Sequence, residues 1–83
     1  MEADDDVVFL VLVRTERKLV EIGVVFRGEV LLSLKDSEEA RRQTHTLATR
    51  LADALEIEVK EFTYRIMNSQ VFWNWEDVAE RVK

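Results

Sequence analysis

The chain has no cysteine, a single histidine and only two glycines among its 83 residues. Without cysteine, neither a disulfide nor a thiolate metal site can stabilise the fold. A chain this short buries only roughly 60–65% of the surface that its unfolded form exposes, so we expect modest stability. The absence of cysteine fits a reducing compartment, and we expect a cytoplasmic protein.

Long hydrophobic runs are also missing from the sequence. No stretch reaches the ~18 apolar residues of a membrane-spanning helix, so we expect no membrane partner. Residues 1–6 are acidic rather than basic, unlike a secretory signal. We interpret residues 1–6 as a solvated acidic tail and residues 7–83 as one domain. Adjacent aspartates on such a tail lack the convergent geometry that a cation needs, so no metal site is expected there.

The net charge limits the classes of partner. It is −5 at pH 7, which disfavours non-specific nucleic-acid binding because that binding depends on phosphate neutralisation. Four basic residues near the ends of the expected strands could still form a basic edge: Arg14, Arg17, Lys18 and Arg27. Glutamates are interspersed among them, which favours scattered surface charge over a binding site.

Residues 36–55 predict the main helix. Asp36 or Ser37 is a suitable N-cap, and Glu39 stands at capping-box spacing from Asp36. Apolar or small residues then recur on one helical face, at positions 40, 44, 47, 48, 51, 54 and 55. We therefore expect an amphipathic helix from about 38 to 55 that covers one face of a sheet. Glu38 and Arg42 have the spacing of an i,i+4 ion pair on its other face.

The residues before this helix predict a three-stranded antiparallel meander. Val7 to Val13 is an unbroken apolar run, typical of a strand that is covered on both faces or that lies centrally in the sheet. After a polar turn, residues 19–26 predict a second strand with one face formed by Val20, Ile22, Val24 and Phe26. Gly23 in this strand indicates a bulge or a close approach of another group.

A tight hairpin turn at Arg27-Gly28 leads to the third strand. This strand spans residues 29–35. Its expected inward-pointing residues are Val30, Leu32 and Leu34, and Leu31 is expected to point outward. Residues 7–35 therefore form a compact set of neighbouring strands with very short connections.

Residues 58–66 allow two interpretations. Their β-branched and aromatic side chains favour a strand, whereas the spacing of Leu55, Val59, Phe62 and Ile66 would continue the helix. We prefer a fourth strand that runs parallel to the first, with a right-handed crossover. The result is an α+β domain with a mixed sheet in the order 3-2-1-4. The i,i+4 spacing of Val78 and Val82 predicts a short C-terminal helix from about 75 to 82.

Several short motifs resemble the ribonuclease H-like family. Residues 21–26 and 28–31 look like its second and third strands, and residues 51–57 are similar to the end of its first helix. That helix usually has a glycine at the place of Glu56. Residues 68–71, Asn-Ser-Gln-Val, look like the Asp-Ser-Gln stretch after its fourth strand. The resemblance covers most of residues 7–75 and implies a shortened domain without the fifth strand and later helices.

The family cuts the RNA strand of RNA–DNA hybrids with two metal ions that carboxylates hold. Those carboxylates are missing here. The first strand reads Val-Leu-Val-Arg and supplies no aspartate, the usual helix glutamate is replaced by Arg41, and the aspartate of the Asp-Ser pair is Asn68. An arginine and an amide cannot replace charged ligands around two divalent cations. The resemblance therefore implies a domain without catalytic residues, metal or cofactor.

No other residues form a catalytic pattern. His45 stands alone on the expected exposed helix face, without the partners of a zinc site or a triad. Ser33, Ser37 and Ser69 have no partner pattern for nucleophilic catalysis, and we interpret them as strand, cap and turn residues.

The segment 72–75, Phe-Trp-Asn-Trp, has two open interpretations. Its tryptophans could cap the core beneath the second helix, or they could form an exposed aromatic patch, since Trp and Tyr are enriched at interface hot spots. Without a fifth strand, the fourth strand would present an open edge that pairing with another chain removes. We expect interface residues at four positions: Tyr64, Phe72, Trp73 and Trp75.

These features predict a non-catalytic protein-interaction domain. It would act as a homodimer, through the fourth strand or the aromatic segment, or as a subunit of a larger complex. The alternative is a nucleic-acid-binding module of degenerate ribonuclease H-like type. A third hypothesis, which we do not favour, is an enzyme whose carboxylates come from the acidic tail or from a second chain.

Overall fold

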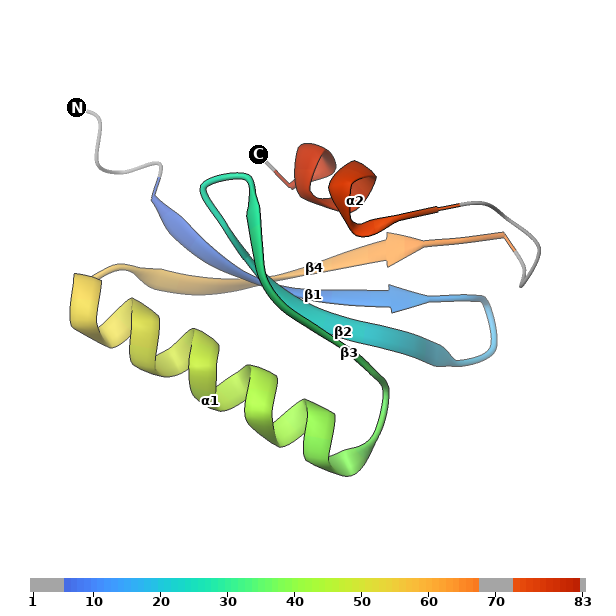
Figure 1. Cartoon of the computed structure of the whole chain (residues 1–83), viewed down its shortest axis with the longest axis horizontal. Coiled ribbons are helices and arrows are strands. Elements are labelled where there is room, and N and C mark those ends of the chain that lie inside the picture. The colour runs from blue at the N-terminus through green and yellow to red at the C-terminus, as the bar shows by residue number, and fades with distance from the viewer. Residues whose placement is uncertain (1–5, 68–72, 83) are drawn as a thin grey trace.

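The computed structural model describes residues 6–67 and 73–82 of the chain. Across these residues the chain forms four strands and two helices (Figure 1). They are β1 (Val7–Arg14), β2 (Leu19–Phe26), β3 (Glu29–Lys35), α1 (Glu38–Leu55), β4 (Glu58–Arg65) and α2 (Trp75–Arg81). The α+β class is confirmed, and residues 58–65 form a strand rather than a continuation of α1.

The four strands form one mixed sheet in the order β3-β2-β1-β4, as the sequence predicts. β2 pairs antiparallel with both β1 and β3. β1 and β4 are parallel and pair without interruption, from Val7 opposite Glu58 to Arg14 opposite Arg65. The crossover through α1 thus returns the chain to the free side of β1.

Helices cover both faces of the sheet, with α1 on one side and α2 on the other (Figure 1). On the α1 side, buried side chains of β1 and β2 pack against three small helix residues, Ala40, Ala48 and Ala52. On the α2 side, other residues of the same strands pack against Val78, Ala79 and Val82. Val8 and Leu10 of β1 belong to the first cluster, and Val11 and Val13 belong to the second. This division confirms that β1 is covered on both faces.

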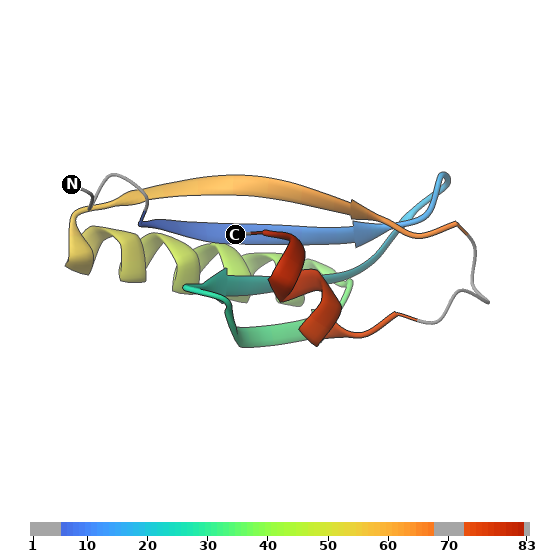
Figure 2. The ribbon, with the colours of Figure 1, turned by 90° about the horizontal axis from the view of Figure 1, so that it is seen from above.

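Ser37 is the N-cap of α1, because its hydroxyl accepts a hydrogen bond of 2.9 Å from the N–H of Ala40. At the other end, Glu56 adopts the left-handed conformation (φ 59°, ψ 44°) that ends the helix. The expected burial of Ala54 and Leu55 is wrong, since both are exposed. The C-terminal end of α1 extends past the start of β1 (Figure 2), although Ala52 in the last turn is still buried in one cluster with Val8.

Two irregularities change which face some strand residues occupy. Between the first two strands, Val13 pairs with Glu21 and Arg14 with Leu19, so Val20 is the extra residue of a bulge. Val20 therefore packs on the α2 side, whereas Ile22, Val24 and Phe26 lie on the α1 side. The expectation that all four residues share one face is wrong.

The second irregularity lies in β3, where Leu31 is the extra residue. Leu31 is 43% exposed, as expected for an outward residue. Val30 packs on the α2 side and Leu34 on the α1 side, so the common inward face expected for them is wrong. The hairpin at Arg27-Gly28 is confirmed, with positive φ angles of 54° and 79°.

Asn74 is the N-cap of the short helix α2, because its side-chain oxygen accepts a hydrogen bond of 2.8 Å from the N–H of Asp77. The turn expected at Asn68-Ser69 lies outside the described residues.

From the acidic tail, Asp6 is described and pairs with Arg27 at 2.7 Å, which lowers the pKa of the Asp6 carboxyl. Neither helix in the described part of the chain is long and apolar enough to cross a membrane.

Candidate functional site

Three of the four predicted interface residues form one aromatic cluster, which we define as Tyr64, Trp73 and Trp75. The ring centroids of Tyr64 and Trp73 are 6.4 Å apart, and those of Trp73 and Trp75 are 5.8 Å apart in an edge-on arrangement. The guanidinium of Arg81 lies 5.9 Å from the centre of the Tyr64 ring. The fourth predicted residue, Phe72, lies outside the described residues.

Trp75 is packed directly on the sheet. A Cβ atom built on Gly23 would lie 2.7 Å from Cη2 of Trp75 and 2.5 Å from the carbonyl oxygen of Leu32. Of the two interpretations of Gly23, the close approach is therefore the one that the structure shows. The indole N–H of Trp75 donates a hydrogen bond of 2.8 Å to Oε1 of Glu21.

All three residues of the aromatic cluster are half-buried against the core on the α2 side. They cap that core beneath α2, which is the first of the two interpretations of the aromatic segment. Their role at an interface with another chain stays a prediction. No sequence pattern indicated Glu21 as the partner of Trp75, because the two are 54 positions apart.

The outer margin of β4 is the second candidate surface. No strand of the described chain pairs with that margin, because β4 is the last strand in the sheet order. All residues of β4 are exposed except Phe62 and Tyr64, which are half-buried. The other outer strand, β3, carries the bulge at Leu31 and is contacted by α2. Among residues 6–67 and 73–82, β4 is therefore the regular edge strand of this sheet, and no other element covers its outer margin (Figure 2).

The backbone of β4 shows which of its groups are available at this margin. The N–H of Ile66 donates to the carbonyl of Arg14 at 2.9 Å, so the backbone of residue 66 points toward β1. Successive residues of a strand direct their backbone groups to opposite sides, so residues 60, 62 and 64 also point inward. The N–H and C=O groups of residues 59, 61, 63 and 65 point away from β1.

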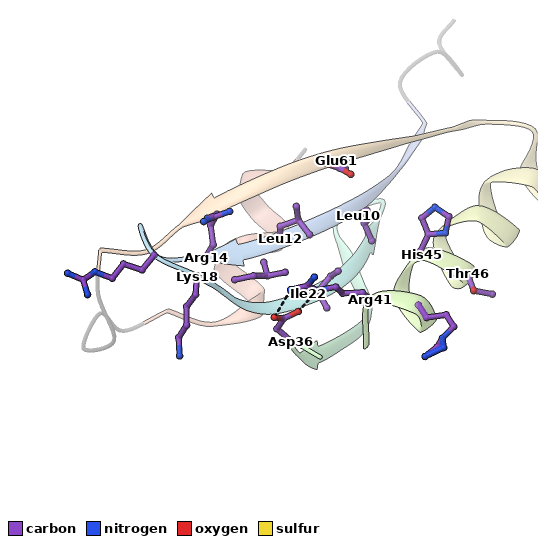
Figure 3. A pocket seen from close by; sticks show the side chains of 13 residues that line it. Leu10, Leu12, Arg14, Lys18, Ile22, Asp36, Arg41, His45, Thr46 and Glu61 are labelled. Carbon is purple, nitrogen blue, oxygen red and sulfur yellow. Dashed lines mark hydrogen bonds and ion pairs between the residues drawn. The ribbon is translucent and has the colours of Figure 1, made fainter. Parts of the chain in front are cut away.

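A groove of about 890 Å³ lies between the first turns of α1 and the end of the sheet that carries the β1–β2 connection (Figure 3). Its floor is apolar and includes Leu10, Leu12 and Ile22. Five basic side chains line it: Arg14, Arg17, Lys18, Arg41 and Arg42. Asp36 and Glu61 supply the carboxylates of its lining. The groove therefore concentrates positive charge in a chain whose net charge is −5.

Ion pairs partly neutralise the two arginines that α1 contributes to the groove. Nε and Nη2 of Arg41 donate to the two carboxylate oxygens of Asp36 at 2.8 and 2.9 Å, and these hydrogen bonds lower the pKa of Asp36. Arg42 pairs with Glu39 at 2.8 Å, rather than with Glu38 as expected from the sequence. Among the described residues, Arg17 and Lys18 have no ion pair. The strongest attraction for an anion is thus expected near the β1–β2 connection.

The groove brings together part of the basic edge that the sequence allows. Arg14, Arg17 and Lys18 contribute to it, whereas Arg27 pairs with Asp6 and does not line it. The sequence did not indicate that Arg41 and Arg42 join them, because this needs the path of α1 across the sheet. His45 also lines the groove and is exposed. Within residues 6–67 and 73–82, no three His, Cys, Asp or Glu side chains could hold a metal ion together.

Comparison of the chain with protein-family models, curated proteins and solved structures gives no match.

Proposed function

We propose that the protein is a non-catalytic interaction domain that associates with a second copy of itself through β4. The observation that supports this proposal is the regular margin of β4, which no other described element covers and to which the backbone groups of residues 59, 61, 63 and 65 point. Such an edge is a template for pairing with another strand. The β3 edge is a poorer template, because its bulge disrupts the ladder.

The proposal is tested by light scattering and sedimentation of the purified chain. Concentrations from about 5 μM to about 500 μM suit the weak association that is typical of interfaces below ~1,200 Å². We expect a monomer–dimer equilibrium in this range. A chain that remains monomeric throughout would contradict self-association.

The variant Thr63→Pro tests whether this association uses β4. The N–H of Thr63 points away from β1, so proline there removes no hydrogen bond within the sheet but blocks pairing with an added strand. We expect a folded monomer by circular dichroism and light scattering. Thr63→Ala is the matched control: it keeps the backbone N–H and should still dimerise, far more strongly than Thr63→Pro. A Thr63→Pro variant that dimerises normally would contradict a β4 interface.

The proposed fold is a shortened ribonuclease H-like one. Its support is the strand order, the parallel pairing of β1 with β4, the path of α1 across one face, and the left-handed residue at position 56, where the family usually has glycine. Arg41 faces the groove and pairs with Asp36, at the place where the family has a metal-binding glutamate. We therefore expect no cleavage of an RNA–DNA hybrid with magnesium or manganese. Cleavage by the purified chain that is lost in Asp36→Asn would contradict the non-catalytic proposal.

The groove supports nucleic-acid binding as a second candidate function. Its five basic side chains could contact phosphates, and their binding would weaken steeply with salt. Two features make it the weaker candidate: the net charge is −5, and none of the described residues that line the groove is Phe, Tyr or Trp, so His45 is the one ring there on which a base could stack.

A titration of a labelled hybrid and of a labelled single strand at low salt separates the two candidates. The second candidate predicts binding that Lys18→Glu weakens and that Arg27→Glu, outside the groove, weakens less. Our leading proposal predicts no binding at micromolar protein.

A further inference from the structure

Two copies of β4 can be brought together in several registers, and the structure favours one of them. The outward backbone groups belong to residues 59, 61, 63 and 65 of β4. In an antiparallel pair, the residues that exchange hydrogen bonds must both direct their backbone outward. In a symmetric pair of β4 strands, one residue therefore faces the same residue of the second copy, and the two-fold axis passes between these two identical residues.

We infer that β4 pairs antiparallel with β4 of a second copy, with the two Thr63 residues facing each other on the two-fold axis. This inference rests on the proposed self-association and gives its geometry. Thr63 then forms a hydrogen-bonded pair with its own copy. Glu61 lies opposite Arg65 of the second copy, and this pair occurs twice because of the symmetry. Phe62 lies opposite Tyr64 of the second copy, also twice.

Each of these side-chain pairs belongs to a class that stabilises antiparallel sheets: threonine with threonine, opposite charges, and two aromatic rings. The facing residues also lie on the same side of the sheet. Glu61 lies on the α1 side, where it lines the groove, and residues 63 and 65 share that side by alternation (Figure 3). Phe62 and Tyr64 lie on the α2 side and pack against its core.

Other positions of the axis give poorer pairs. An axis at Lys60 places two lysines opposite each other, and an axis at Glu61 places two glutamates opposite each other. Both arrangements destabilise the strand pair, because like charges repel. An axis at Phe62 or at Tyr64 forms no pair of opposite charges. An axis at Val59 pairs Glu58 with Lys60 but places Glu61 opposite the half-buried Ile57. The Thr63 axis alone combines charge, aromatic and threonine pairs.

The charges of β4 also explain how an open edge avoids indiscriminate pairing. Glu58, Lys60, Glu61 and Arg65 are all exposed, and charges on an edge strand oppose association with unrelated strands. The same charges are compatible with a second β4 in the Thr63 register. Attraction in one register and repulsion in others is how a specific interface excludes wrong partners.

The test is a charge-exchange experiment on the full chain. Glu61→Lys places a lysine opposite Arg65, and Arg65→Glu places a glutamate opposite Glu61, in two symmetric positions each. We expect each variant alone to dimerise at least about tenfold more weakly than the unmodified chain, because two attractive pairs become repulsive. An equimolar mixture of the two variants should form a heterodimer, because both of its facing pairs then join a positive side chain to a negative one. The double variant should form a homodimer again, because both of its facing pairs are of opposite charge.

Matched controls carry the same change of charge at positions without a facing partner in β4. Glu58→Lys is the control for Glu61→Lys, and Lys60→Glu is the control for Arg65→Glu. Both controls should dimerise within about twofold of the unmodified chain, since their facing positions, 68 and 66, lie beyond the end of β4. All changed positions are exposed, so circular dichroism should show folded variants.

Three outcomes would overturn the register. The first is a double variant, Glu61→Lys with Arg65→Glu, that stays monomeric where the unmodified chain dimerises. The second is a Glu58→Lys variant that is weakened as much as Glu61→Lys, which would indicate the Val59 axis. The third is normal dimerisation of both single variants. Failure of the proposed function gives a different result, because the unmodified chain itself would then be monomeric.

Discussion

The indole N–H of Trp75 reaches back to Glu21 in β2 and donates a hydrogen bond of 2.8 Å to its carboxylate. This bond joins the first residue of α2 to the second strand of the sheet. It satisfies the polar atom of a half-buried ring and fixes the position at which α2 begins. The chain thus uses one charged side chain to hold its C-terminal helix on the sheet.

Removal of the acceptor should therefore lower the stability of the whole domain. We expect Glu21→Ala to reduce the free energy of unfolding by about 1–3 kcal/mol, the usual effect of losing a hydrogen bond to a charged group. Urea unfolding followed by tryptophan fluorescence measures it. Glu21→Gln, which keeps an acceptor oxygen, should lose less. The exposed Glu29→Ala is the control and should change stability by less than ~0.5 kcal/mol; equal losses in Glu21→Ala and Glu29→Ala would contradict the bond.

The space above Gly23 is already filled. We expect Gly23→Ala to destabilise the domain by about 1–3 kcal/mol, because the new methyl group overlaps both Trp75 and the carbonyl of Leu32. The backbone carbonyl cannot move away without disturbing the β2–β3 pairing. Chemical denaturation measures the loss, and Ser33→Ala, opposite Gly23 but exposed, is the control. A Gly23→Ala variant as stable as the unmodified chain would show that the ring and strand adjust freely.

Glu56 offers a stabilising substitution. Its left-handed conformation costs about 1–2 kcal/mol for a residue with a Cβ atom, whereas glycine adopts it freely. Glycine also makes the unfolded chain more flexible, at a cost of about 0.4–1 kcal/mol, so the net gain expected for Glu56→Gly is about 0.5–1 kcal/mol. Thermal and urea unfolding measure this gain. Glu56→Ala removes the same charge but keeps the Cβ atom; if it stabilises equally, the gain comes from charge and not from conformation.

The Asp36–Arg41 pair should make stability depend on pH. Its hydrogen bonds lower the pKa of Asp36 in the folded state below the ordinary value of about 3.9. The folded state therefore binds this proton less readily than the unfolded state. The contribution of the pair is complete above about pH 4 and is lost as pH falls toward the lowered pKa.

Urea unfolding of the unmodified chain and of Asp36→Asn at several pH values tests this dependence. We expect the difference in stability between the two to be small at pH 7, because the pair is partly exposed, and to shrink below about pH 4. Added salt should reduce it at pH 7 as well. A difference that stays constant from pH 7 to pH 3 would contradict the role of the carboxylate charge.

The architecture could be predicted because each element carries a strong local signal. The apolar run of β1 has no polar face, so it required cover on both sides, and the two helices supply it. The bounds of α1 could be predicted because small residues recur on one helical face and a capping residue precedes the first turn. β-branched and aromatic residues decided in favour of a strand at β4, which in turn fixed the sheet order.

Other features could not be predicted because they depend on single-residue shifts or on distant contacts. The alternation from Val20 to Phe26 is continuous in the sequence, so nothing there marks the bulge that moves Val20 to the other face. The groove combines residues of the β1–β2 connection with the first turns of α1, and their meeting depends on the crossing of the helix. The partner of Trp75 likewise becomes visible only when β2 and α2 are in place.

The bulge at Leu31 has a consequence for the size of any assembly. An isologous union through β4 uses the same margin of both chains, and each remaining outer margin is a β3 whose ladder is interrupted. Growth by further strand addition would have to start at that interrupted ladder. In the proposed dimer, the joined sheet would therefore be self-limiting: it would end at two chains rather than polymerise into a fibre.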